Sequence, residues 1–152
     1  PEPMSEVIAN IRKFIGKVYG PITYEIGKEK LKEYAKAIKN PDPHYMDDGF
    51  AKQTKYGSVI APPTFAVVYA GMLAEPLFFD KELALNLFML VHGEQEFEFF
   101  DVVKPGDVLT SKGTIVNIEN KEKLDVVTLV GESTNQHGTL VCKAIFTFVI
   151  RK

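Results

Sequence analysis

The stretch TFAVVYAGMLAE, residues 64–75, decides how this chain folds. The helix that it predicts is apolar on all sides, and a helix of that kind must be surrounded by protein. Its apolar part, residues 65–74, is well short of the roughly 20 residues needed to cross a bilayer. We therefore expect residues 64–75 to form the central helix of a soluble protein.

Strand patterns fill the rest of the C-terminal half. Residues 94–100 alternate Glu with Gln or Phe, and turn sequences at 104–107 and 135–138 separate further strand patterns. Four consecutive strands predict an antiparallel meander, at residues 94–100, 108–118, 124–132 and 139–150. We expect this sheet to curve around the central helix and to leave its other face for packing on something else.

The N-terminal half contains shorter elements. A capped amphipathic helix is predicted at residues 5–15, a strand at 18–24 and a second helix at 28–39, which two prolines end. Residues 40–63 then form a long connection rich in Pro, Asp and Gly, with one helical turn near 48–55. Long ordered loops often carry binding and catalytic groups, so this connection is the first place to search for a site.

Composition limits the class of protein. With 152 residues, 45% of them hydrophobic and 25% charged, the chain fits one globular domain spanning residues 1–152. A net charge of −2 with interleaved Lys and Glu argues against nucleic acid as a partner. A single cysteine and the lack of an export pattern predict a cytoplasmic protein that is not bound to a membrane. No residues have metal-ligand spacing.

Four segments in order resemble the MaoC-like dehydratase family. They are AIKNPDPHYMDDGFA (37–51), YGSVIAPPTF (56–65), HGEQEF (92–97) and VKPGD (103–107). The nearest branch is typified by the N-terminal dehydratase domain of type I fatty-acid synthases and by the mycobacterial hydroxyacyl dehydratase heterodimers. This resemblance implies an α+β hot-dog fold, in which a curved antiparallel sheet wraps a central helix and two domains usually join their sheets edge to edge.

The resemblance also implies a substrate class and a reaction. Members of the family act as hydro-lyases, adding water to 2-enoyl thioesters or removing it from 3-hydroxyacyl thioesters in fatty-acid metabolism. The acyl group is carried on coenzyme A or acyl carrier protein, and no other cofactor is expected.

The catalytic pair of the family is replaced in this sequence. Active members keep an Asp and a His in the motif D-x-N-P-x-H-x-D. With Pro43 and Asp47 aligned to the motif, Asn40 occupies the position of the catalytic Asp and Tyr45 that of the catalytic His. An amide has no useful proton affinity at neutral pH and a phenol has an ordinary pKa near 10, so neither suits this acid–base chemistry.

Other residues remain candidates for acid–base chemistry. A shifted register makes His44 the catalytic histidine, but Lys39 then stands where a carboxylate is needed. Without that shift, His44 fills a variable position, and Asp42 fixes the loop by accepting backbone N–H bonds. His92, next to Glu94, is a third candidate, and a structural hydrogen bond is its simpler explanation.

The oxyanion site is the second departure. In active relatives a His-Gly pair at the start of the central helix supplies a backbone N–H to the thioester oxygen, and here the pair reads Pro62-Pro63. Proline has no N–H, so the donor is missing unless Thr64 or another group replaces it. Pro63 is also a good first residue of a helix. The expected substrate-binding residues are Tyr45, Pro62, Pro63, Thr64, His92 and Gly93.

Three functions are consistent with these residues. The first is a subunit of a heteromeric hydratase that binds substrate and is inactive without a catalytic hot-dog partner. The second is an active homodimer with a rearranged site built from Asp42, His44 or His92. The third is an acyl-thioester-binding or thioesterase-type protein. His137 is expected to be solvated in a turn, and Cys142 to be buried in the core.

Overall fold

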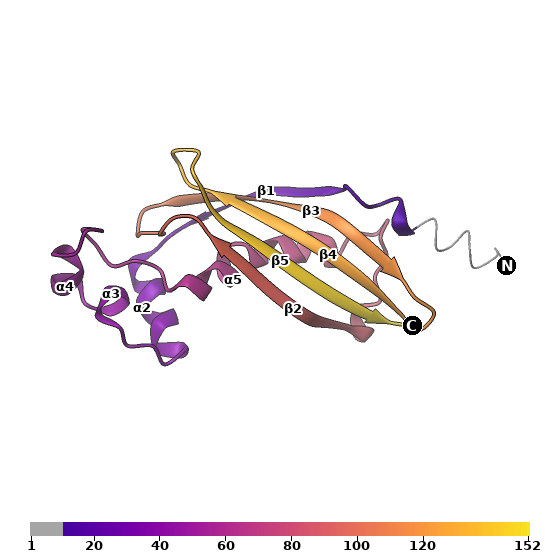
Figure 1. Cartoon of the computed structure of the whole chain (residues 1–152), viewed down its shortest axis with the longest axis horizontal. Coiled ribbons are helices and arrows are strands. Elements are labelled where there is room, and N and C mark those ends of the chain that lie inside the picture. Colours follow the sequence, from indigo (N-terminus) through magenta and orange to yellow (C-terminus); the bar gives the residue numbers. More distant parts are fainter. Residues whose placement is uncertain (1–10) are drawn as a thin grey trace.

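The fold is one antiparallel sheet with helical segments behind it, as the computed structural model describes it for residues 11–152 (Figure 1). The five strands lie in the order β1-β3-β4-β5-β2. Their bounds are β1 (Val18–Glu25), β2 (Leu90–Phe99), β3 (Val108–Asn120), β4 (Leu124–Thr134) and β5 (Leu140–Arg151). The predicted sheet around a central helix is confirmed, with β1 and β2 as its two edges.

The predicted meander of four strands is wrong, because β2 pairs with β5 and not with β3. Only β3, β4 and β5 follow one another in space as in the sequence. The connection 100–107 is too long for a tight hairpin turn. Backbone hydrogen bonds hold it to Ile26 and Ala61, so it carries the chain across the end of the sheet.

The central helix is less regular than predicted. It consists of η1 (Pro63–Phe65), α5 (Ala66–Tyr69), η2 (Gly71–Leu73) and α6 (Ala74–Phe78). Pro76 explains the short 3₁₀ segment before α6, because it cannot donate to the carbonyl four residues earlier and its ring crowds that carbonyl. The prediction that protein surrounds this helix is also wrong, since one side is buried against the sheet while Val67 and Met72 are exposed.

Leu73 fixes how closely the central helix approaches the sheet. Its Cδ1 lies over Gly113 and Gly131, which are direct cross-strand neighbours on β3 and β4. A Cβ built on Gly131 would stand 2.9 Å from Leu73 Cδ1, and one on Gly113 would stand 3.4 Å away. The paired glycines therefore form the notch into which this side chain packs.

The helices before the central helix correct the N-terminal predictions. The second helix is α2 (Lys28–Ala37), and the connection after it contains α3 (Pro43–Met46) and α4 (Asp48–Lys52). The predicted turn is confirmed as α4, whereas α3 was missed because its proline was interpreted as a stop. Pro43 is instead the first residue of α3, where a missing N–H costs nothing.

Two predictions concern the chain ends and the membrane. The helix predicted at residues 5–15 falls largely on residues 1–10, which lie outside the described part of the chain. In residues 11–152, every helix is too short or too polar to span a bilayer.

Asp80 links β1 to the segment that follows α6. Its Oδ2 accepts hydrogen bonds from the Tyr19 hydroxyl and the Lys17 ammonium, both at 2.6 Å. Its Oδ1 accepts from the backbone N–H groups of Glu82 and Leu83 at 3.0 and 3.5 Å. Burial opposes ionisation of this carboxyl group, but these donors outweigh burial and lower the pKa of Asp80 to about 2.

Candidate functional site

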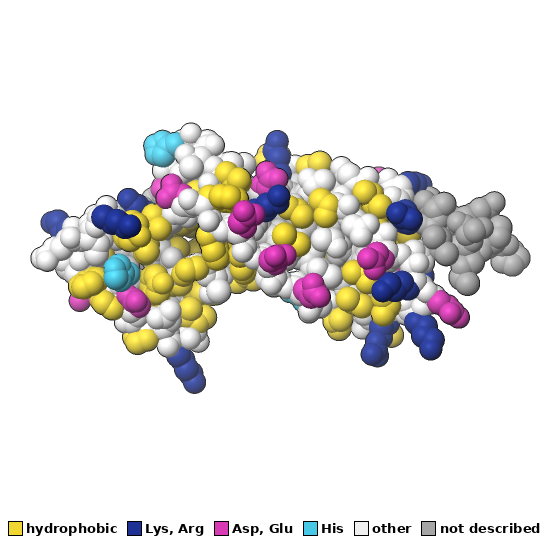
Figure 2. All heavy atoms as spheres, viewed as in Figure 1, with side chains coloured by type: hydrophobic (Ala, Val, Ile, Leu, Met, Phe, Trp, Pro, Cys, Tyr) yellow, Lys and Arg dark blue, Asp and Glu magenta, His cyan; other side chains and the backbone are white. Residues whose placement is uncertain are grey.

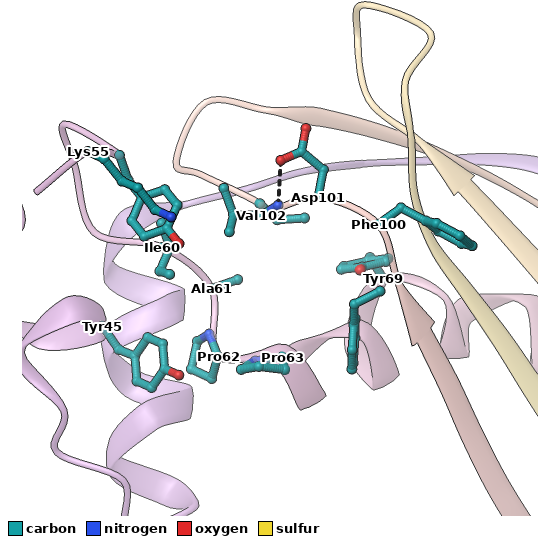
Figure 3. A pocket seen from close by; sticks show the side chains of 13 residues that line it. Tyr45, Lys55, Ile60, Ala61, Pro62, Pro63, Tyr69, Phe100, Asp101 and Val102 are labelled. Atoms are coloured by element: carbon teal, nitrogen blue, oxygen red, sulfur yellow. Dashed lines mark hydrogen bonds between the residues drawn. The ribbon is translucent and has the colours of Figure 1, made fainter.

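A pocket of about 440 Å³ lies where the connection after α4, the start of the central helix and the end of β2 meet (Figure 3). This volume is within the range of small-molecule sites. Most of the lining side chains are aromatic or aliphatic. The pocket is lined by Tyr45, Lys55, Tyr56, Ile60, Ala61, Pro62, Pro63, Tyr69, Phe99, Phe100, Asp101, Val102 and Val103.

Tyr45 reaches the pocket from α3. Figure 3 shows its ring beside Pro62 and its hydroxyl directed toward the cavity. Burial and, to a smaller extent, the negative charge of Asp42 raise the pKa of Tyr45 above its ordinary value. The hydroxyl therefore stays protonated at neutral pH, where it can donate a hydrogen bond but cannot serve as a base.

Pro62 and Pro63 form the wall at the start of the central helix. Pro62 is buried, and Pro63 is the first residue of η1, as its role in starting a helix requires. Two successive prolines leave this wall without their backbone N–H groups. Thr64 does not line the pocket, and its hydroxyl accepts a hydrogen bond from the Tyr34 hydroxyl at 3.0 Å.

The opposite wall consists of Tyr69 from α5 and of residues 99–103. Figure 3 shows Tyr69 across the cavity from Pro62 and Pro63, whereas the ring of Phe100, another lining residue, points away from the prolines. Burial raises the pKa of Tyr69, so its hydroxyl is neutral as well. Sequence reasoning missed this wall, because the motif at 92–97 directed attention to the beginning of β2 and not to its end.

Lys55 and Asp101 are the charged residues of the pocket lining, and sequence reasoning missed both. The Lys55 ammonium lies 5.2 Å from the centroid of the Tyr56 ring. The Asp101 carboxylate accepts a hydrogen bond from the Val102 backbone N–H at 2.8 Å. No imidazole lines the pocket. Within residues 11–152, no group of three or more His, Cys, Asp or Glu side chains could hold a metal ion.

Asn40 and the candidates for acid–base chemistry, Asp42, His44 and His92, lie outside this pocket. Asn40 is exposed after α2, where its backbone N–H donates to the Ala35 carbonyl. Asp42 caps α3, accepting from the His44 N–H at 2.9 Å as the loop-fixing interpretation predicts. The same oxygen lies 2.7 Å from His44 Nδ1, so Asp42 also orients the imidazole. Both hydrogen bonds lower the pKa of Asp42.

His92 and Gly93 lie on β2, away from the pocket lining. The His92 ring packs near that of Phe148, with 5.2 Å between centroids, and Gly93 stands at a β-bulge. His137 is exposed in the turn before β5 and Cys142 is buried, as predicted. Of the six expected substrate-binding residues, the structure thus brings Tyr45, Pro62 and Pro63 together and leaves Thr64, His92 and Gly93 outside.

Comparisons with known proteins agree with this fold. Residues 13–144 match the family model described as FAS1-like, dehydratase domain region. The UPF0336 protein of Streptomyces avermitilis is 38% identical over 141 residues, which are 92% of this chain and 94% of that protein.

Solved structures with the same fold include dehydratases and hydratases. One is the C-terminally truncated HadBC (3R-hydroxyacyl-ACP dehydratase) complex from Mycobacterium tuberculosis, with 26% identity and a TM-score of 0.79, covering 90% of this chain and 96% of that one. Another is the R-hydratase PhaJ1 from Pseudomonas aeruginosa, with 20% identity and a TM-score of 0.69, covering 93% and 86%. The sheet and helix thus form the predicted hot-dog fold, and the chain belongs to the FAS1-like dehydratase-domain family.

Proposed function

We propose that this chain is the substrate-binding subunit of a 3-hydroxyacyl-thioester dehydratase or 2-enoyl-thioester hydratase, and that a second hot-dog subunit supplies the catalytic Asp and His. One observation carries this proposal. The pocket gathers the family positions Tyr45, Pro62 and Pro63, yet its lining contains no imidazole, and its one carboxylate, Asp101, is bound to a backbone N–H.

An acyl thioester suits the chemistry of this pocket. The aromatic and aliphatic walls can bury an acyl chain, since apolar lining with a few polar groups is typical of sites for apolar ligands. Coenzyme A and the phosphopantetheine arm of acyl carrier protein both carry phosphate. The Lys55 ammonium is the one cation of the lining and would meet that phosphate at the mouth.

Hydration needs groups that this pocket lacks. A base must activate water, an acid must protonate the α carbon, and donors must hold the charge on the thioester oxygen. The neutral Tyr45 hydroxyl can donate one hydrogen bond, while Pro62 and Pro63 offer no N–H. Substrate binding without turnover follows from this arrangement.

The edge of β2 is the place where a second subunit would join. HadBC, the complex with 26% identity to this chain, motivates a two-chain assembly. Strand β2 is outermost in the sheet, so its free backbone groups can pair with an edge strand of a partner. The pocket lies at the end of this strand, within reach of groups that a partner would bring.

Calorimetry with crotonyl-CoA tests the proposal on the chain alone. We expect binding without hydration, which is followed as loss of the enoyl absorbance. Lys55→Met should weaken binding at low salt, whereas the matched control Lys52→Met, on exposed α4, should not. Ala61→Trp should fill the pocket and abolish binding. Hydration by the wild-type chain at the rate of an enzyme, or no binding at all, would refute the proposal.

The hydrogen-bonded pair of Asp42 and His44 favours a second candidate, an active hydratase with a rearranged site. A carboxylate at 2.7 Å from Nδ1 leaves Nε2 as the reactive atom of the imidazole. If this pair is catalytic, His44→Ala must abolish turnover by the chain alone while the protein stays folded. Our proposal expects no turnover to lose.

A further inference from the structure

The two edges of the sheet are not equivalent. On β1, Pro21 has no N–H to donate and the pairing with β3 is irregular between Tyr19 and Ile22. On β2, the pairing with β5 is regular from Glu94 to Phe99, after the bulge at His92. A long regular edge without proline is the one suited to pair with another strand.

Exposed apolar side chains flank the β2 edge at both ends. Phe88, just before the strand, is 100% exposed, and Val91, Phe99 and Phe100 are also exposed. Side chains of this kind at the two ends of a free edge are typical of a surface that another protein covers. The apolar residues do not indicate which protein binds here, whereas the charged residues between them indicate the chemistry of its edge strand.

Between the apolar ends, β2 carries three exposed glutamates on one face. Gln95 and Phe97 turn toward the core, since they pair with the buried Phe146 and Ala144 of β5. Glu94, Glu96 and Glu98 alternate with them and so point outward, away from the helices. We call these three residues the acidic stripe. Within residues 11–152, no Lys, Arg or His nitrogen lies within 4.0 Å of their carboxylates.

Glu98, at one end of the acidic stripe, is the last member of a row of alternating charges that crosses the sheet. Lys112 on β3 is the cross-strand neighbour of Glu132 on β4, which neighbours Lys143 on β5, which neighbours Glu98 on β2. Figure 2 shows acidic and basic side chains side by side on the sheet face toward the viewer, with further acidic ones along the β2 edge. The next position in this row lies on a partner's strand, where a cation would continue the alternation.

A second copy of the chain would place like charges there. If two copies join at β2 with their helices on the same side of the sheet, outward residues stand opposite outward residues. In the register centred on Glu96, glutamate faces glutamate three times: 94 with 98, 96 with 96, and 98 with 94. Registers centred on residue 94, 95, 97 or 98 also place at least one of these glutamates opposite another. Like charges directly opposite each other destabilise a strand pair.

We propose that the β2 edge selects a different chain, one whose edge strand carries Lys or Arg on its outward face, and disfavours a second copy of this chain. The inference rests on the proposed function, because it takes the partner to be a second hot-dog subunit joined at β2. It adds the chemistry by which that subunit is recognised: the Lys112–Glu132–Lys143–Glu98 row continues into the partner.

A charge-swapped copy of the chain serves as the probe. The variant Glu94→Lys, Glu96→Lys, Glu98→Lys presents the cations that the proposal requires. At about 50 mM NaCl, where charges are weakly screened, wild type and variant should each be monomeric at micromolar concentration. Their equimolar mixture should form a one-to-one dimer, on the order of tenfold to a hundredfold tighter than either chain with itself. Sedimentation velocity gives the affinity, and native mass spectrometry identifies the mixed species.

The control variant carries the same change of charge elsewhere. Glu29→Lys, Glu33→Lys, Glu122→Lys alters three exposed glutamates away from β2, and mixing it with wild type should yield no dimer. The proposal is overturned if the wild type pairs with itself as tightly as the mixture, if the mixture stays monomeric, or if the control dimerises equally.

Two measurements keep these outcomes interpretable. If the triple variant loses the wild-type circular dichroism spectrum, Glu96→Lys alone, at the centre of the stripe, replaces it in the same mixtures. Crotonyl-CoA binding by the wild type is measured on the same preparation. Its absence would count against the proposed function, whereas failure of the mixed dimer would count against the selection by charge.

Discussion

Replacement of Asp80 by asparagine tests a largely buried polar contact that links β1 to the segment after α6. The carboxylate is only 9% exposed and accepts four hydrogen bonds, from Tyr19, Lys17 and the N–H groups of Glu82 and Leu83. Its pKa falls from 3.8 to about 2 in the folded chain. At about 1.4 kcal/mol for each pKa unit, the ionised group contributes about 2 kcal/mol to the free energy of unfolding. We expect Asp80→Asn to lose about this amount at pH 7.

The same shift predicts how the loss depends on pH. Because the pKa of Asp80 is lower in the folded state, its contribution is complete above the unfolded value of 3.8 and disappears as the pH falls through about 2. The difference between wild type and Asp80→Asn should therefore be constant from pH 7 to pH 5. At pH 3 it should have fallen to roughly half.

Urea unfolding at each pH measures this difference. The matched control is Asp48→Asn, whose carboxylate is 52% exposed and pairs with Lys32 at 2.7 Å. Because solvent and salt screen an exposed ion pair of this kind, its loss should cost much less than the loss of Asp80. If Asp80→Asn costs no more than the control at pH 7, or costs as much at pH 3 as at pH 7, the argument from the shifted pKa is wrong.

Three further substitutions follow from the structure. Ser111→Ala should lower the free energy of unfolding by about 1–3 kcal/mol, because it leaves the buried Ser133 hydroxyl without its partner at 2.6 Å. The double variant Ser111→Ala, Ser133→Ala should unfold at a higher urea concentration than the single variant, and the reverse order would contradict the pairing. Gly131→Ala should lower the free energy of unfolding by about 1–3 kcal/mol, because the new methyl group would crowd Leu73. The loss should be smaller when Leu73 is also replaced by alanine, and an equal loss with and without Leu73→Ala would exclude this contact as the cause. Because the pKa of Tyr45 is raised, crotonyl-CoA affinity should stay constant from pH 7 to pH 9; an ionisation in that range that Tyr45→Phe removes would show the hydroxyl to be acidic.

The sequence identifies the positions that differ from the family's catalytic motif, but it does not predict which of them lie close together in space. Spacing around Pro43 placed Asn40 and Tyr45 at the family's acid–base positions, and Pro62-Pro63 at its oxyanion position. The structure places Tyr45 and the prolines on one pocket and leaves Asn40 exposed at the end of α2. Sequence spacing fixes neighbours along a loop, whereas convergence on a cavity depends on how that loop folds back over the sheet.

The opposite wall of the pocket shows why part of the site was missed. Phe99, Phe100 and Tyr69 are ordinary apolar residues in sequence, and nothing in their local pattern separates core from pocket lining. They line the cavity because β2 crosses to the far edge and pairs with β5. Sheet order is set by long-range pairing, which strand periodicity does not report.

The central helix, residues 64–75, shows which features the sequence determines and which depend on the tertiary structure. Its apolar composition by itself predicts a helix covered by protein, because burying that surface outweighs any exposed arrangement. Only the tertiary structure decides that the sheet covers one side, through Leu73 in the Gly113–Gly131 notch, and leaves Val67 and Met72 exposed on the other. Hydrophobicity acts on each residue alone and so can be read from the sequence. The partner of each buried atom depends on packing between segments distant in the chain.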